Sequence, residues 1–323
     1  MRNPDDIANI NTHSQADLSY LFDKEHFISS LHTACPQMAL YNQISDYPKH
    51  AVLQHKIPIV PRSLQDTLPP TGWTHPEEWH DKFHAWLDNK TTISASAPAL
   101  VGLGRAYLEY PIHSDSPLFA SNFGKILRFR EDVRHLAATT LYSLSQTFDL
   151  AMNAERGIQE NAYFGAHLRT EADAVKAFDV RFNNSRYEVQ SKLFLEQAKG
   201  AELPVLYLAS GNQTEIQRFK TDALNEYGIS VTTKSELLAG VDLETLEALA
   251  WDQRGLVDFL VLLKASQFAG IGHSSFAWNI ALVRHLESQV EGYLEGDQLL
   301  SDEFSRIYGV PLSTPQYASC MWP

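Results

Sequence analysis

Residues 165–173 (GAHLRTEAD) bring basic and acidic side chains together directly after a short apolar run. His167 and Arg169 are two positions apart, so an extended chain points both to the same side. The planar fork of an arginine is suited to phosphate oxygens, and a histidine can add a further hydrogen bond. The alternative is a structural ion pair of Arg169 with Glu171 or Asp173. The spacing alone leaves both interpretations open.

Residues 268–276 (FAGIGHSSF) form a second candidate segment, in which glycines separate an apolar run from two serines. Glycines let the backbone approach a ligand closely, and the first N–H groups of a helix hold anions. Ser274 and Ser275 could cap such a helix and donate to phosphate. The alternative is an ordinary strand-to-helix turn with serine caps. A hydrolase nucleophile elbow needs Gly-x-Ser-x-Gly, and Phe276 stands where the last glycine should be.

The elements around these segments predict how they are positioned. Beyond about residue 155, short apolar runs alternate with stretches of helical period, which is typical of a doubly wound parallel sheet. In such sheets ligands bind outside the carboxyl ends of the strands, where both segments fall. The expected strands are residues 163–168, 204–209, 229–233 and 268–271. The expected helices are residues 171–178, 191–199, 214–227 (ended by Gly228), 243–265 (two helices broken near Gly255) and 275–286.

The first half of the chain is less regular and richer in aromatic residues and prolines. We expect helices at residues 23–31, 79–87 and 126–148 and a strand within residues 99–110. The last of these helices should pack with the sheet that follows. We therefore predict two domains, residues 1–154 and residues 155–323.

Composition excludes several classes of protein. The chain has 323 residues with 26 Lys+Arg against 39 Asp+Glu, a net charge of −13, which argues against a nucleic-acid partner. No apolar stretch approaches the roughly 20 residues of a membrane span, and no signal peptide is visible. Two cysteines, Cys35 and Cys320, leave no room for a disulfide scaffold or a Cys-rich zinc site, although one bridge between them is possible.

Weaker signals accompany these features. His75 and His80, or His80 and His84, could be metal ligands on a helix, but no third ligand accompanies them, so a solvated helix face is the favoured interpretation. Glycosylation sequons begin at Asn89, Asn183 and Asn212 and point only weakly towards a secretory compartment.

Taken in order, several segments resemble the GDP-fucose protein O-fucosyltransferase-like family, especially its plant and fungal branches. The first, residues 18–28 (LSYLFDKEHFI), is similar to the family's FD-x-x-HFI segment, and residues 167–173 are similar to its His-x-Arg motif with trailing acidic residues. The remaining similar segments are residues 127–129 (LRF), 205–211 (VLYLASG), Asp258, 265–268, 274–276 and Arg284.

The resemblance implies a GT-B-type glycosyltransferase fold, an α/β architecture of two Rossmann-like domains that face each other across a cleft. It implies transfer of fucose from GDP-fucose to a protein serine or threonine hydroxyl, with inversion and without a metal or other cofactor. The partners it implies are the nucleotide-sugar donor and a protein or glycan acceptor. The family also implies the lumen of the endoplasmic reticulum or Golgi. The acidic chain is compatible with this donor, because a local cluster of basic groups can hold one nucleotide diphosphate.

The same resemblance implies roles for individual residues. Arg169 would contact the diphosphate and stabilise the charge developing on the GDP leaving group, which is a physical alternative to Mg²⁺. His167 would hold the nucleotide, and Asp173 would contact guanine or ribose. Ser274, Ser275 and Phe276 would complete the phosphate-binding segment.

One family feature is missing from the expected place. The family usually begins with a strand, a glycine-rich loop and a helix before FD-x-x-HFI, whereas only seventeen residues, without glycine, precede Leu18. We therefore expect the N-terminal domain to be incomplete. A catalytically inactive GDP-sugar-binding homologue or a truncated fragment is the main alternative to an active transferase, and an α/β hydrolase with Ser274 as nucleophile is a remote one.

Overall fold

The chain forms two compact units, Met1–Lys24 with Arg128–Leu312, here called the sheet unit, and Glu25–Leu127 with Ser313–Pro323. This division differs from the boundary that the sequence predicts between residues 154 and 155. That boundary stays a prediction. The computed structural model describes residues 16–34, 36–37, 39–41, 46, 56–59, 81, 84–90, 100–103, 124–172, 174, 183–285, 287–288 and 301–309, with the backbone alone at 34, 56–59, 100–103, 124 and 183.

A five-stranded sheet with the order β5-β4-β3-β6-β7 forms the centre of the sheet unit. All neighbouring strands are parallel. The chain runs outward from β3 through β4 to β5, then returns to β6 on the other side of β3, so the strand order reverses between β3 and β6. This confirms the predicted parallel α/β sheet, whereas the two-domain GT-B arrangement stays a prediction. The strands are β3 (Phe164–His167), β4 (Leu206–Ala209), β5 (Val231–Thr232), β6 (Gln267–Ile271) and β7 (Ser305–Tyr308).

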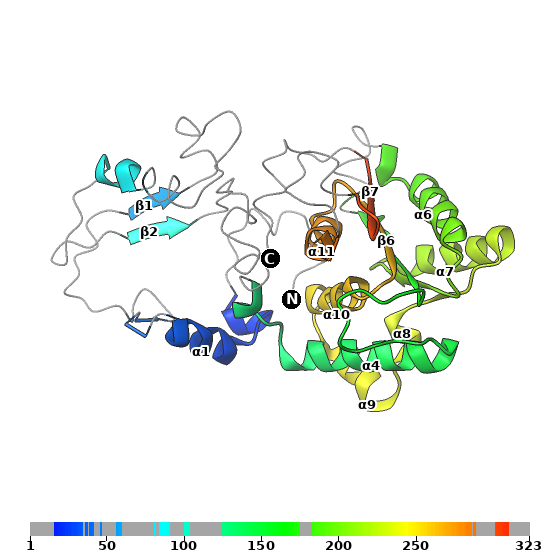
Figure 1. The fold of residues 1–323 in the computed structure, drawn as a ribbon, viewed down its shortest axis with the longest axis horizontal. Helices are drawn as coiled ribbons and strands as arrows, with labels where there is room; N and C mark the ends of the chain where they lie inside the picture. The colour runs from blue at the N-terminus through cyan, green and yellow to red at the C-terminus, as the bar shows by residue number, and fades with distance from the viewer. Residues whose placement is uncertain are drawn as a thin grey trace. The chain divides into compact units, whose positions relative to one another are not determined.

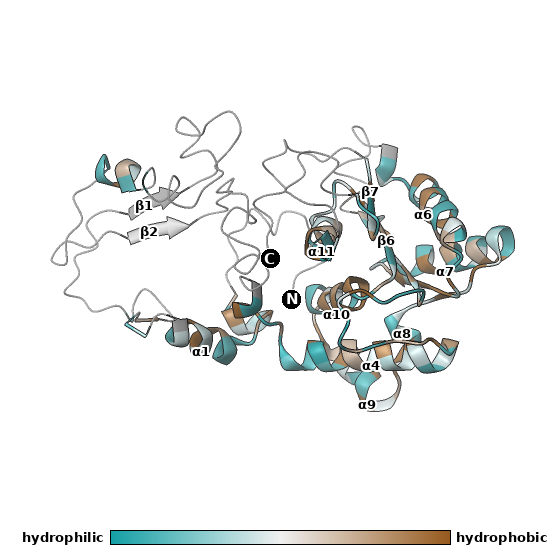
Figure 2. Cartoon of the chain, in the orientation of Figure 1, coloured by the Kyte–Doolittle hydropathy of each residue, from teal (hydrophilic) through white to brown (hydrophobic). Residues whose placement is uncertain are grey.

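Helices cover both faces of this sheet. On one face, Phe194 of α6 and Phe219 of α7 pack with Leu168 and Leu208 in one buried cluster. On the other face lie α10 and α11, and α4 packs against α10 (Figure 1). Hydrophobic and hydrophilic residues alternate around the turns of α6 (Figure 2), as expected of a half-buried helix. The helices are α4 (Glu131–Phe148), α6 (Tyr187–Ala201), α7 (Gln213–Asp222), α8 (Lys234–Leu237), α9 (Gly240–Ala248), α10 (Trp251–Leu263) and α11 (Ser275–His285).

Short helical turns complete the sheet unit. A π-helical turn, η8 (Ala223–Tyr227), continues α7 and ends at Gly228, whose φ of 69° is the left-handed stop that the sequence predicts. The remaining turns are η2 (Leu18–Tyr20), η6 (Gly124–Ile126) and η7 (Asn183–Ser185), of which η6 belongs to the second unit. None of the helices in the described ranges combines the length and the apolar composition needed to cross a membrane.

Two expected helix boundaries are wrong. The break expected near Gly255 lies instead at Leu249 and Ala250, which have extended backbones, and the Ala250 N–H donates to Gln253 Oε1 at the start of α10. Gly255 is tolerated inside α10 because a glycine costs a helix only about 1 kcal/mol. The helix expected from residue 126 begins at Glu131.

In the second unit, β1 (Lys56–Ile59) and β2 (Leu100–Leu103) form a parallel pair. Strand β2 confirms the start of the strand expected within residues 99–110, whereas β1 was not expected. Helix α1 (Lys24–Ala34) begins one residue after the start expected at residue 23 and ends three residues beyond the end expected at residue 31. Most of the helix expected at residues 171–178 falls outside the described residues.

Candidate functional site

The two predicted ligand segments meet at the carboxyl ends of β3 and β6. His167 is the last residue of β3, and its Nδ1 lies 3.4 Å from the Oγ of Ser274 in the turn after β6. The His167 ring also packs on the Phe276 ring, with 4.5 Å between the ring centroids. The structure thus brings together three of the predicted site residues at the point where the strand order reverses, the usual ligand position in doubly wound sheets.

Burial keeps His167 neutral. Removal from water lowers its pKa most, and the nearby charges of Arg169, His273 and Lys234 act in the same direction, so that the pKa falls to about 3. Burial also lowers the pKa of His273, to about 4. Near neutral pH both imidazoles are therefore uncharged, and the lasting positive charge at the carboxyl ends of these strands belongs to Arg169 and Lys234.

Arg169 lies two residues beyond the end of β3, with its side chain 18% exposed. Its Nη1 pairs with Glu171 Oε2 at 2.5 Å, so the ion pair that the sequence left open is present. The other oxygen of Glu171 accepts a hydrogen bond of 2.8 Å from the backbone N–H of Gly211, in the turn after β4. Glu171 therefore joins the turns after two neighbouring strands. A guanidinium has five N–H donors, so this pair is compatible with contacts to an anion.

Helix α11 begins at the predicted serines. Ser274 is buried and its Oγ lies 3.5 Å from the backbone N–H of Ala277, while Ser275 is exposed as the first helical residue. The indole N–H of Trp278 donates to the carbonyl of Gly272, which holds the turn in place. The first backbone N–H groups of α11 consequently lie at the carboxyl end of β6, an arrangement suited to an anion.

A buried polar network near this edge was not predicted from the sequence. Tyr207 in the middle of β4 donates its hydroxyl to Asp258 Oδ1 at 2.7 Å, and Lys234 pairs with Asp258 Oδ2. Burial raises the pKa of Asp258, against the opposing effect of Lys234. The available signal was that Tyr207 and Asp258 interrupt otherwise apolar segments, which is unusual for a core unless the polar groups are paired.

Arg284 is one of the C-terminal positions that carry the family resemblance. The structure places its guanidinium at the amino ends of the strands, whereas the candidate site lies at their carboxyl ends. Its guanidinium is buried and donates to the carbonyls of Leu263 (2.8 Å) and Ala265 (2.6 Å) before β6, and to that of Phe304 (2.7 Å) before β7. Its Nε donates to Ser305 Oγ at 2.9 Å. Arg284 therefore caps the C-terminal end of α10 and ties two strands together, so its role is structural.

A series of aromatic contacts connects Phe22 to the site. The rings of Phe22 and Phe129 stack with centroids 5.6 Å apart, and Phe129 meets Phe259 edge-on at 5.7 Å. Phe259 in turn meets Phe276, which packs on His167. Phe22 and Phe129, each from a segment that carries the family resemblance, therefore support the site through packing.

Asp173, Cys35 and Cys320 lie outside the described residues. Within the described part of the chain, no group of three or more His, Cys, Asp or Glu side chains is arranged to hold a metal ion.

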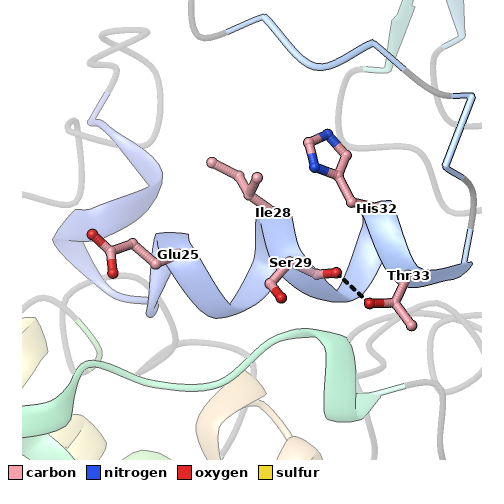
Figure 3. Close-up of a pocket in the computed structure, with 5 residues that line it drawn as sticks. All are labelled: Glu25, Ile28, Ser29, His32 and Thr33. Carbon is pink, nitrogen blue, oxygen red and sulfur yellow. Dashed lines mark hydrogen bonds between the residues drawn. The ribbon is translucent and has the colours of Figure 1, made fainter.

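A shallow hollow follows one side of α1 and shares no residue with the predicted site (Figure 3). Because all of its lining residues come from a single helix, it does not enclose a ligand. They are Glu25, Ile28, Ser29, His32 and Thr33.

Comparison with known protein families gives a match. The sequence profile of GDP-fucose protein O-fucosyltransferase matches residues 5–287, which is most of the chain. No curated protein matches the chain closely enough to be compared with it. The profile match spans both candidate segments and the N-terminal segment that supports them, and the chain therefore belongs to the GDP-fucose protein O-fucosyltransferase family.

Proposed function

We propose that the protein transfers fucose from GDP-fucose to a serine or threonine hydroxyl of a protein acceptor, with inversion at the anomeric carbon and without a metal ion. Family membership supports the donor and the class of reaction. The observation that carries the proposal is the meeting of the His167 and Ser274 segments at the carboxyl ends of β3 and β6. An anionic ligand in a doubly wound sheet binds at this position.

In the proposed reaction, the acceptor oxygen forms a bond to the anomeric carbon of fucose while the bond from that carbon to the β-phosphate oxygen breaks. The electron pair leaves with GDP, and the proton of the acceptor hydroxyl passes to the departing β-phosphate oxygen or to water. Arg169 contacts the diphosphate and stabilises this charge, since fixed donors placed where charge develops lower the barrier. Arg169 is thus the proposed catalytic residue.

The other site residues hold the donor. Neutral His167 supplies a hydrogen bond without adding charge, while Ser274, Ser275 and the first N–H groups of α11 bind phosphate oxygens. Phe276 supports the His167 ring through their packing contact. Asp173 is proposed to contact guanine or ribose. The GT-B arrangement of two Rossmann-like domains and a place in the lumen of the endoplasmic reticulum or Golgi belong to the same proposal.

The test is a transfer assay with purified protein, GDP-fucose and serine- or threonine-containing acceptor proteins, in the presence of EDTA. Mass spectrometry of the acceptor should show the added fucose, with an equal amount of GDP released. A complete lack of transfer and of donor hydrolysis by a protein that binds GDP-fucose would contradict the catalytic proposal.

A GDP-sugar-binding protein without catalysis is a second candidate. The ion pair between Arg169 and Glu171 favours it, because a guanidinium held by a carboxylate of its own chain stabilises a leaving group less. Thermal shifts with GDP and GDP-fucose, measured beside donor hydrolysis, separate the two functions. Binding with turnover supports the transferase, and binding without turnover supports the second candidate.

A further inference from the structure

The turn after β4 lies unusually close to the first residue of α10. A Cβ atom built on Gly211 would be 2.8 Å from Trp251 Nε1 and 2.9 Å from Glu171 Oε1, closer than real Cβ atoms approach other groups. Any side chain at position 211 would have to displace this indole or this carboxylate. The indole of Trp251 consequently lies beside the Glu171 carboxylate that pairs with Arg169.

Trp251 is exposed at this edge of the sheet. Its exposed fraction is 39%, so much of this residue is open to solvent. Helix α10 leads into β6, so its first residue lies near the carboxyl ends of the strands and its last residues near the amino ends, where Arg284 caps it. An exposed aromatic ring offers a flat apolar face that a nucleobase can cover.

The position of Trp251 and Gly211 relative to the strands indicates which part of a nucleotide reaches them. In doubly wound sheets, the phosphates lie at the turn after the first strand, and the nucleoside extends towards the end of the second strand. Here β3 is the first strand and carries His167 and Arg169 at its end, while β4 is the second and carries Gly211.

We propose that Trp251 and Gly211 form the nucleobase subsite of this protein. The purine of the bound nucleotide stacks on the exposed indole, while its diphosphate extends towards Arg169 and Ser274. This inference rests on the proposed function, because it assumes a nucleoside-diphosphate ligand. Since every base offers a π-face, the stack supplies affinity rather than the choice of guanine.

The test is isothermal titration of the wild-type protein and its variants with GDP, guanosine and inorganic pyrophosphate. Trp251→Ala should weaken GDP and guanosine roughly tenfold or more, the scale of one base stacked on an aromatic ring. It should leave pyrophosphate affinity within about twofold, and Trp251→Phe should retain most of the GDP affinity because a ring remains. Arg169→Ala should show the reverse pattern, with weaker GDP and pyrophosphate but unchanged guanosine.

Tyr142→Ala is the matched control, because Tyr142 is a 67% exposed aromatic residue on α4 of the same unit. It should leave all three affinities unchanged. Trp251→Ala with wild-type GDP affinity would overturn the subsite, as would equal losses of GDP and pyrophosphate. GDP-fucose is titrated in the same way. If Trp251→Ala loses affinity for GDP-fucose but not for GDP, the ring contacts the hexose, and the nucleobase subsite is overturned. Failure of the wild-type protein to bind GDP would instead contradict the proposed function.

Discussion

Gln190 and Arg169 exchange two hydrogen bonds of 2.9 Å, one from the Arg169 backbone N–H to Gln190 Oε1 and one from Gln190 Nε2 to the Arg169 carbonyl. Strand β3 has already ended at His167, so a fully buried side-chain amide takes the place of a neighbouring strand. The backbone from which the Arg169 guanidinium extends is therefore held by α6. Gln190 is a positioning residue for Arg169.

Replacement of Gln190 by methionine should weaken both folding and nucleotide binding. It leaves a buried N–H and C=O of Arg169 without partners, at a cost of about 1–3 kcal/mol in the free energy of unfolding. We expect weaker GDP binding by titration in the folded protein as well. Ser191→Ala, at the next buried polar position of α6, is the control and should leave GDP affinity unchanged. A destabilised Gln190→Met protein with wild-type GDP affinity would limit Gln190 to a structural role.

Replacement of Arg169 by alanine should weaken GDP binding by roughly 1.5–3 kcal/mol, because charge-assisted hydrogen bonds to the diphosphate are lost. Calorimetric titration measures the change. Arg156→Ala is a matched control, since Arg156 is also an arginine paired with a glutamate, Glu160, in the same unit. If Arg169→Ala binds GDP as tightly as the wild-type protein, the site has been assigned to the wrong residues.

Acid should destabilise the protein partly through His167. The folded-state pKa of about 3 is below the ordinary value of 6.5, so the unfolded chain binds more protons between these two values. The contribution of His167 is thus complete above pH 6.5 and is lost as the pH falls towards 3. At about 1.36 kcal/mol per pH unit, the stability lost through His167 is about 2 kcal/mol at pH 5.

Denaturant unfolding of the wild-type protein and of His167→Asn between pH 7 and pH 5 measures this contribution. The stability of the variant should change less with pH than that of the wild-type protein, because asparagine does not titrate. Equal slopes for the two proteins would mean that His167 gains its proton as readily in the folded state as in the unfolded state.

Replacement of Arg284 by methionine should reduce stability without changing the affinity of the folded protein for GDP. The side chain is buried, and its loss leaves the carbonyls of Ala265 and Phe304 among several unpaired acceptors. We expect a loss of about 3 kcal/mol or more in the free energy of unfolding, measured with denaturant. GDP titration below the unfolding transition is the second readout. A selective loss of GDP affinity in a stable Arg284→Met protein would return Arg284 to the ligand site.

Local patterns were sufficient for much of the fold. The apolar runs of β3, β4 and β6 and the helices between them predicted the parallel sheet, because strands buried on both faces are apolar throughout. Strand alternation also placed His167 on one face and Leu168 on the other, and the structure confirms this with Leu168 in the cluster beneath α6. The break expected at Gly255 was wrong because propensity is a weak guide where packing holds the helix together.

The sequence by itself determined the class of the sheet, four of its five strands, the family and the two segments that meet at β3 and β6, whereas the edge strand β7 was not expected. Only the tertiary structure decided which partners those segments have. Gln190 contacts Arg169 across 21 positions and Arg284 contacts Ala265 across 19, while Gly211 lies against Trp251. Such pairings depend on how helices pack on the two faces and edges of the sheet. Local propensity and periodicity carry no information about them, because they describe each element before it has neighbours.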